Sequence, residues 1–234
     1  MEIVVAPDPQ SAAVEAADWL VKQLHLAVSK RGEASVALSG GSTPALMFAA
    51  LAKRAVPWQA TAIFQVDERV APADDPDRNS LLLDVLRARR PVINLMPVEA
   101  TDLAAAAAGY AAELPDRLDV VHLGIGDDGH TASWPPGDPV IDAPGLVAVS
   151  GDYKGRVRMT LTVAAVNAAR HRVVLATGAS KAAIVERWLL GDQRLPIDRV
   201  RRASTLVILD DAAAARLPCA PPSRAASGGS RRPR

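Results

Sequence analysis

A polar segment in the middle of the chain combines glycines with groups that exchange protons. Residues 122–136 read HLGIGDDGHTASWPP, and Asp128 stands two residues before His130, across a glycine. An imidazole gains and loses its proton near neutral pH, and a nearby carboxylate can orient the ring. Such a pair can take a proton from water and return it to a leaving oxygen. The segment is therefore a candidate acid/base site. The alternative is a loop histidine that an aspartate holds for structural reasons alone, which is the commoner case for an isolated Asp-Gly-His.

The same segment contains G-x-G-x-x-G, the glycine pattern of dinucleotide-binding loops, which ends at Gly129. That interpretation requires a helix that begins at the third glycine, within a βαβ unit. Pro135 and Pro136 follow too soon, because a proline ring nitrogen has no hydrogen to donate and cannot continue a helix. Asp127 and Asp128 would also repel a pyrophosphate at this place. We therefore expect no dinucleotide cofactor and no NAD-dependent oxidoreductase activity.

A second glycine-containing segment, VALSGGSTPAL, has the pattern of a strand, a tight turn and a helix. Gly40 and Gly41 let the backbone turn sharply and expose its N–H groups. Thr43 is expected to cap the helix and Pro44 to begin it. Free N–H groups at a helix N-terminus, together with hydroxyls such as that of Ser42, favour a phosphate. The alternative is an ordinary capped helix, and the segment is not a P-loop because no Gly-Lys-Ser/Thr ends it.

An acidic and basic segment, Asp-Glu-Arg at 67–69, directly follows the apolar run AIFQV. The planar guanidinium of Arg69 could bind a phosphate or a carboxylate through two hydrogen bonds, and Asp67 is a further candidate beside it. Taken by itself, the segment favours a solvated ion-pair cluster.

Further cations precede or follow predicted strands near the C-terminal half. Arg158 begins the strand VRMTLT, and Lys181 lies in the first turn of a helix after the glycine turn of ATGAS. The helix dipole favours an anion at that end, so we expect a negative group near Lys181. Lys154 and Arg156 lie in the loop before Arg158, where they form either a mobile basic flap or a solvated surface.

Short apolar runs that alternate with helical patterns position these segments. Near-continuous apolar strands are typical of a sheet covered on both faces, and the alternation predicts an α/β domain with a mostly parallel sheet flanked by helices. Ligands of such sheets lie outside the carboxyl ends of the strands, where the segments above would meet. Strands are expected at 3–6, 34–39, 61–67, 118–126, 145–150, 157–162, 172–177 and 204–210, and helices at 11–30, 44–54, 79–90, 102–114, 163–169 and 180–190, with Gly32 ending the first and Asn79 capping the third.

Composition limits the class of protein. The 234 residues are 49% hydrophobic but only 3% aromatic, so the core must be aliphatic, and a net charge of +1 gives no case for a nucleic-acid partner. We expect one domain over residues 1–218 and a disordered basic tail over 219–234 that contains Cys219, the only cysteine. That excludes an internal disulfide and a thiolate metal site. The N-terminus does not resemble a signal peptide and no apolar run is long enough to span a membrane, so we expect a cytoplasmic protein.

Taken together, five motifs in this order resemble the glucosamine-6-phosphate isomerase/6-phosphogluconolactonase family, in its 6-phosphogluconolactonase branch. They are LSGGSTP, VDER with DPDRN, GIGDDGHTAS, RMTLT with a following N and AR, and ATGASKAAI, and the resemblance covers roughly residues 10–217. It implies a single Rossmann-like domain that hydrolyses 6-phospho-D-glucono-1,5-lactone to 6-phospho-D-gluconate in the oxidative pentose phosphate pathway. It also implies a small-molecule substrate, no metal and no organic cofactor, and we expect a monomer or a weak homo-oligomer.

The resemblance also assigns roles to residues of this sequence. His130 matches the general acid/base of the family and Asp128 matches its partner. The phosphate loop of the family is matched by Gly40, Gly41, Ser42 and Thr43. The basic residues that face the sugar phosphate in the family are matched by Arg69, Arg158 and Lys181. Further candidates are Asp67, Lys154 and Arg156.

The chain departs from the family pattern in two places. Trp134, Pro135 and Pro136 stand where the family usually has Leu-Phe-Pro, which we expect to change the wall beside the site, and DYKGRV replaces a proline-rich segment before RMTLT. A glucosamine-6-phosphate deaminase on the same fold is the nearest alternative, but that branch has Asp-Glu-Tyr where this chain has Asp-Glu-Arg. It also has Asn-Glu-Pro after the histidine, where this chain has Thr-Ala-Ser. A non-catalytic sugar-phosphate sensor would lack the histidine or the aspartate, and both are present.

Overall fold

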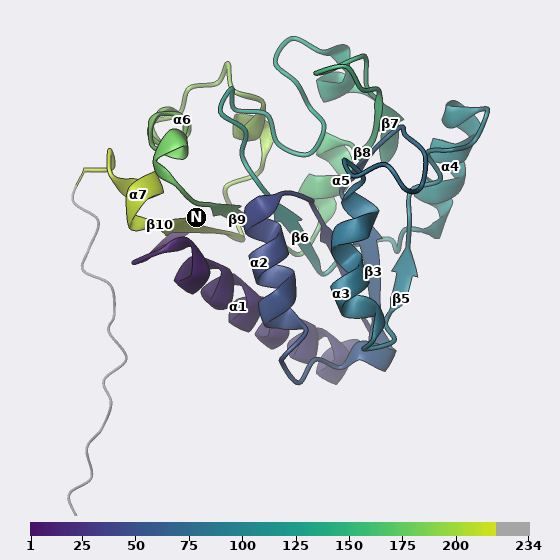
Figure 1. Ribbon diagram of the computed structural model, residues 1–234, viewed down its shortest axis with the longest axis horizontal. Coiled ribbons are helices and arrows are strands. Elements are labelled where there is room, and N and C mark those ends of the chain that lie inside the picture. The colour runs from purple at the N-terminus through teal and green to yellow at the C-terminus, as the bar shows by residue number, and fades with distance from the viewer. Residues whose placement is uncertain (219–234) are drawn as a thin grey trace, which may run out of the picture.

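A twisted seven-stranded parallel sheet forms the centre of the molecule in the computed structural model, which describes residues 1–218 (Figure 1). Its strands run in the order β1 (Glu2–Ala6), β10 (Thr205–Asp210), β9 (His171–Ala176), β6 (Val120–Leu123), β2 (Ala34–Leu38), β3 (Thr61–Gln65) and β5 (Val92–Asn94). This confirms the predicted mostly parallel sheet flanked by helices. The basic tail at 219–234, with Cys219, lies outside the described residues.

Side chains that alternate along each strand divide the core into two layers. In β10, Leu206 and Ile208 pack on one face, while Val207 and Leu209 pack on the other. The first face is covered by α1 (Pro9–Arg31), α2 (Ser42–Leu51) and α3 (Asp84–Arg87). The second is covered by α4 (Leu103–Glu113), α5 (Val163–Ala168), α6 (Ala182–Leu189) and α7 (Asp211–Ala214).

A smaller antiparallel sheet stands beyond the carboxyl end of the central one. It consists of β4 (Asp67–Arg69), β8 (Arg158–Leu161) and β7 (Val147–Val149), in that order. The predicted strand 61–67 is therefore wrong as a single element: Val66 lies between β3 of one sheet and β4 of the other. The N–H of Val66 donates to the carbonyl of Leu38 in β2, and its carbonyl accepts from Leu161 in β8. The chain thus turns from one sheet into the other next to the polar segment at 67–69.

Two helices begin after an aspartate cap: α1 starts at Pro9, two residues before the predicted start at 11, and α4 starts at Leu103, one residue after the predicted start at 102. Asp8 accepts a hydrogen bond from the N–H of Ser11 at the start of α1, and Asp102 accepts one from the N–H of Ala105 in α4. Gly32 ends α1 in the left-handed conformation, with φ of 82°, as expected of a glycine after a helix.

Two other helix starts differ from the prediction. Helix α2 begins at Ser42, so Pro44 is its third residue, and the Thr43 hydroxyl bonds the hydroxyl of Thr177 (2.7 Å) in place of capping. The predicted helix 79–90 is a 3₁₀ turn, η2 (Asn79–Leu83), followed by the short α3. Asn79 does not cap it: it is the first residue of η2, its side-chain oxygen accepts from Arg69, and its amide donates to the backbone carbonyl of Asp67 (2.9 Å).

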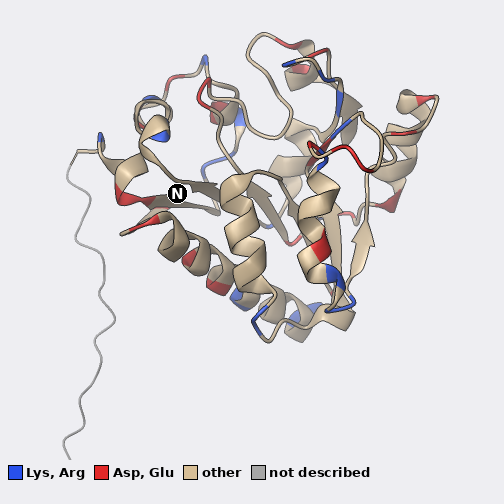
Figure 2. Ribbon diagram, viewed as in Figure 1, with Lys and Arg blue, Asp and Glu red and all other residues tan. Residues whose placement is uncertain are grey.

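Charged residues are distributed unevenly over the elements of the molecule. Helix α2 contains none, whereas both acidic and basic residues occur on the loops beyond the carboxyl ends of the strands (Figure 2). Within residues 1–218, no helix has the length and apolar character needed to cross a membrane.

Candidate active site

The predicted site segments meet in a cleft of about 230 Å³ at the carboxyl ends of β9, β6 and β2. These three strands are neighbours in the sheet, so the loops that follow them converge, as the position of ligands in open α/β sheets predicts. The third loop, after β9, leads through a 3₁₀ turn, η4 (Ala179–Lys181), into α6. The polar and glycine residues that line the cleft are Ser39, Gly40, Gly41, Ser42, Thr43, Asp67, Arg69, Asn79, Gly124, Gly126, His130, Thr131, Arg158, Thr177 and Lys181.

The histidine and the aspartate of the loop after β6 form a hydrogen-bonded pair. Nδ1 of His130 lies 2.6 Å from Oδ1 of Asp128, and the same oxygen accepts from the backbone N–H of His130 (3.1 Å). Burial alone would raise the pKa of Asp128, but hydrogen bonds from Tyr153 and His130 outweigh it and hold that pKa below its ordinary value. The carboxylate is therefore ionised at neutral pH, and its partner Nδ1 carries a proton. Within residues 1–218, Nε2 of His130 has no hydrogen-bond partner and is available to a ligand.

The glycines of G-x-G-x-x-G make room for this pair. A Cβ atom at position 126 would lie 2.0 Å from two ring atoms of His130. Gly129 has φ of 86°, and a Cβ there would lie 2.9 Å from Leu195. After Gly129 the chain makes a tight turn closed by a bridge between Thr131 and Trp134, which confirms the predicted absence of a helix at this point.

Tyr153 contacts both residues of the Asp128–His130 pair, and sequence reasoning missed it. Its hydroxyl lies 2.5 Å from Oδ2 of Asp128 and 3.2 Å from Nδ1 of His130. Burial and the hydrogen bond to Asp128 raise the pKa of Tyr153 to about 12, so the hydroxyl keeps its proton at neutral pH. The available signal was its place in DYKGRV, where the chain departs from the pattern of the family it resembles.

The glycine turn after β2 also lines the cleft. Gly41 has φ of 127°, and a Cβ at Gly40 would lie 1.8 Å from the side-chain oxygen of Asn79. Both positions therefore require glycine, one for its backbone conformation and one for a close approach. Ser42 and Thr43 follow at the N-terminus of α2 and also line the cleft.

Three predicted cations reach the cleft. Arg158 is 7% exposed, and burial together with the neighbouring charge of Arg69 lowers its pKa. Arg69 is held by the backbone carbonyl of Asp77 (2.7 Å) and by the side chain of Asn79. Lys181 pairs with Asp127, which is the negative group that its place at a helix start predicted.

Two further candidates stay outside the cleft. Arg156 pairs with Asp75 (2.7 Å) and lies near Asp77 (3.7 Å), and the amine of Lys154 lies over the ring of Tyr153. Neither Lys154 nor Arg156 lines the cleft, so the structure does not bring them to the predicted phosphate position.

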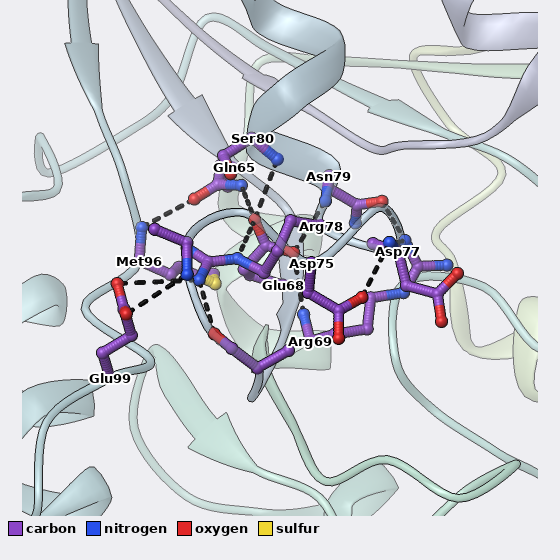
Figure 3. Close-up of polar contacts among 12 residues, drawn as sticks. Gln65, Glu68, Arg69, Asp75, Asp77, Arg78, Asn79, Ser80, Met96 and Glu99 are labelled. Atoms are coloured by element: carbon purple, nitrogen blue, oxygen red, sulfur yellow. Dashed lines mark hydrogen bonds and ion pairs between the residues drawn. The ribbon is translucent and has the colours of Figure 1, made fainter.

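The segment at 67–69 is a buried network rather than a solvated ion-pair cluster (Figure 3). Glu68 is fully buried and accepts hydrogen bonds of 2.8 Å from the side chain of Gln65 and from the backbone N–H groups of Arg69, Asn79 and Ser80. Its carboxylate also lies 3.2 Å from Nε of Arg78. The solvated interpretation fails because β4 pairs with β8 and η2 folds back over Glu68. The network fixes the place of Arg69 in the cleft.

Asp67, the further candidate beside Arg69, lines the cleft but is already engaged. It is buried, and its Oδ2 accepts a hydrogen bond from the hydroxyl of Ser133 (2.7 Å). Asp67 therefore links the loop after β6 to the small sheet.

Trp134 does not form a wall of the site, contrary to expectation. It is fully buried in the core, where its indole N–H donates to the carbonyl of Leu161 (2.8 Å). The turn between Thr131 and Trp134 directs the indole into the second hydrophobic layer, away from the cleft.

His122 is a structural residue that does not line the cleft. It is fully buried in β6, and its Nδ1 accepts a hydrogen bond from the N–H of Ser39 (3.3 Å). Burial lowers its pKa to about 3, so the ring is neutral at physiological pH.

Within residues 1–218, no group of three or more histidine, cysteine or acidic side chains is arranged to hold a metal ion.

Known proteins resemble this chain in sequence and in fold. The family model described as glucosamine-6-phosphate isomerases/6-phosphogluconolactonase matches residues 7–208. A 6-phosphogluconolactonase of Streptomyces coelicolor is 34% identical over 93% of this chain and 95% of its own length. A 6-phosphogluconolactonase of Synechocystis is 36% identical over 66% of this chain and 71% of its own length. A crystal structure of a 6-phosphogluconolactonase from Shewanella baltica matches with a TM-score of 0.82 and 26% identity, covering 90% of this chain and 97% of that one.

The family match spans nearly the whole of the described chain, from the residues just before α1 into β10, the last strand of the sheet along the chain. Together with the parallel sheet and the loops that converge on Asp128 and His130, it shows that the chain belongs to the glucosamine-6-phosphate isomerase/6-phosphogluconolactonase family.

Proposed function

We propose that this chain hydrolyses 6-phospho-D-glucono-1,5-lactone to 6-phospho-D-gluconate, in the oxidative pentose phosphate pathway. The observation that carries the proposal is one cleft lined by His130, whose ring is hydrogen-bonded to Asp128, by the glycine turn after β2 and by the three cations Arg69, Arg158 and Lys181. Relatives that cover most of this chain are 6-phosphogluconolactonases, which supports the same substrate here.

In this proposal the cations and the glycine turn hold the 6-phosphate. Lys181, Arg69 and Arg158 supply positive charge, and the N-terminus of α2 with Ser42 and Thr43 supplies hydrogen-bond donors. Lys181 exchanges Asp127 for the phosphate when substrate enters, because Asp127 is largely exposed and easily hydrated.

His130 then acts on the lactone carbonyl. Because Nδ1 donates to Asp128, Nε2 has a free lone pair and can take a proton from water. The hydroxide attacks C1, and the C1–ring oxygen bond breaks as the tetrahedral intermediate collapses. His130 returns the proton to the ring oxygen, so that one water is consumed and the open acid is formed. Asp128 stabilises the charged imidazole between the two proton transfers.

The test is a lactone-hydrolysis assay, with the substrate generated by glucose-6-phosphate dehydrogenase and spontaneous hydrolysis subtracted. His130→Ala is expected to lower kcat by about 10²–10⁴-fold, the usual contribution of general acid/base catalysis, with a small change in KM because the phosphate site is intact. Turnover near that of the wild type in this variant would contradict the role of His130. Ammonia release from glucosamine 6-phosphate, with no lactone hydrolysis, would instead indicate the deaminase branch.

We further propose that the enzyme works in the cytoplasm as a monomer or weak homo-oligomer, with no nucleic-acid or membrane partner, and that residues 1–218 form its folding unit. A net charge of +1 and a small polar substrate support this.

A further inference from the structure

A tight hairpin tip carries Tyr153 to the catalytic pair. The backbones of Tyr153 and Arg156 exchange two hydrogen bonds, of 3.0 and 3.3 Å. Between them, Lys154 and Gly155 both have positive φ, 55° and 76°, which is the geometry of a type I′ turn. Asp152 accepts from the N–H of Gly155 and closes the turn from outside. Such a turn fixes the directions of the two residues that flank it.

The two residues that flank the turn, Tyr153 and Arg156, each contact another loop. Arg156 pairs with Asp75 in the loop after β4, while Tyr153 contacts the loop after β6. The guanidinium of Arg158 lies 5.1 Å from the centroid of the Tyr153 ring, a cation–π distance. The phenol ring therefore has a defined place between Arg158 and the His130 imidazole, whose centroid is 5.3 Å away.

The hydroxyl of Tyr153 has one proton and two neighbours. The shorter contact, 2.5 Å to Oδ2 of Asp128, takes that proton because the carboxylate is ionised and accepts only. Its oxygen is then an acceptor toward the Nδ1–H of His130 at 3.2 Å. Both oxygens of the carboxylate are thus engaged, Oδ1 by His130 and Oδ2 by Tyr153, although the Asp128 side chain is 36% exposed.

We propose that Tyr153 is a positioning residue that acts through Asp128: its hydroxyl holds Oδ2 so that Oδ1 stays on Nδ1 of His130. This fixes the imidazole tautomer that leaves Nε2 free to accept a proton. Without the hydroxyl, water would compete for Oδ2 and the carboxylate could rotate about its Cβ–Cγ bond. The meaning of this role for catalysis rests on the proposed function, whereas the contacts themselves do not.

Tyr153→Phe tests the proposal because it keeps the ring that Arg158 and His130 contact and removes only the hydroxyl. We expect kcat for the lactone to fall roughly tenfold, the order expected for one lost hydrogen bond to a charged group, with KM within about twofold. In the free protein, the low-field NMR signal of the His130 Nδ1–H should shift and exchange faster with water. Tyr110→Phe is the matched control: the hydroxyl of Tyr110 bonds the backbone of Gln65 and Asn94, and its loss should leave kcat and the Nδ1–H signal unchanged.

A double-variant comparison shows whether Tyr153 acts through Asp128. In an Asp128→Asn background, Tyr153→Phe should cause little further loss of kcat. An equal loss in both backgrounds, or an unchanged kcat and Nδ1–H signal in the single variant, would overturn the proposal. If wild-type protein shows no lactone hydrolysis while Tyr153→Phe still alters the Nδ1–H signal, the proposed function fails and the positioning role stands.

Discussion

At the scale of single residues, the glycine pattern that resembles a cofactor loop has a different physical reason. The imidazole of His130 occupies the space where a side chain at position 126 would lie, and the N–H of Gly126 donates to the carbonyl of His130 (2.8 Å). The loop is therefore folded around its histidine. The same three glycines that predict a pyrophosphate site in a dinucleotide-binding protein make room here for Asp128 and His130 to come together.

Gly126→Ala is expected to lower kcat about as strongly as His130→Ala does, by about 10²-fold or more, because the new methyl group must displace the ring. The φ of Gly126 is not in the left-handed region, so the backbone can accept alanine there. The free energy of unfolding, measured with urea, should therefore fall by about 1–2 kcal/mol at most. Gly109→Ala, in α4 with nothing within 4 Å of the added methyl, serves as the control. It should leave kcat unchanged and raise the unfolding free energy by about 0.5–1 kcal/mol. Wild-type turnover in Gly126→Ala would show that the ring can move aside without cost.

At the scale of elements, one buried carboxylate joins β4 to the segment that follows it. Glu68 satisfies the first N–H groups of η2, at Asn79 and Ser80, and balances the buried charge of Arg78 (Figure 3). The position of Arg69 in the cleft depends on this connection, because Arg69 is bonded to Asn79 on one side and follows Glu68 in the chain on the other.

Glu68→Gln should therefore cost about 3–5 kcal/mol of unfolding free energy, the range for breaking a buried charge pair, and should raise KM for the lactone. The chain supplies a matched control in Glu99, which lies 3.8 Å from the same arginine but is 58% exposed. Glu99→Gln should cost less than about 1 kcal/mol because solvent screens the pair. Urea denaturation of the two variants measures the difference, and equal costs would show that burial of Glu68 carries no special weight.

The same elements show what the sequence could predict. Hydrophobic periodicity and the glycine after the first helix, Gly32, are local signals, and most of the strands and helices predicted from them are confirmed to within a few residues. The break of the strand at Val66 and the lost caps at Thr43 and Asn79 depend on residues far along the chain, Leu161, Thr177 and Asp67 respectively. Hydrogen bonds over such separations have no local sequence pattern. Tyr153 was missed for the same reason, since its partner Asp128 lies 25 residues away.

At the scale of the whole molecule, the two ends of the central sheet differ in chemistry. The carboxyl ends of β9, β6 and β2 open into the cleft, while at the amino end Asp119 pairs with Arg31 and Arg170 and accepts from the N–H of Ser35. Between these ends, β6 is covered on both faces. Its one imidazole, that of His122, is completely excluded from water and packs edge-on against Phe48.

The burial of His122 should make the stability of the whole molecule depend on pH. Its pKa falls from 6.5 in an unfolded chain to about 3 in the folded one, so between these values the unfolded state binds a proton that the folded state excludes. The stabilisation is complete above pH 6.5 and decreases as the pH falls, by about 1.4 kcal/mol per pH unit from this group. His122→Asn does not titrate and retains an acceptor for the N–H of Ser39. The free energy of unfolding should be measured by urea denaturation from pH 7.5 to 4 in both proteins. Below pH 6.5 its slope against pH should be smaller in the variant than in the wild type, by about 1.4 kcal/mol per pH unit. Above pH 7 the two slopes should be equal. Parallel slopes over the whole range would mean that His122 takes up its proton without unfolding.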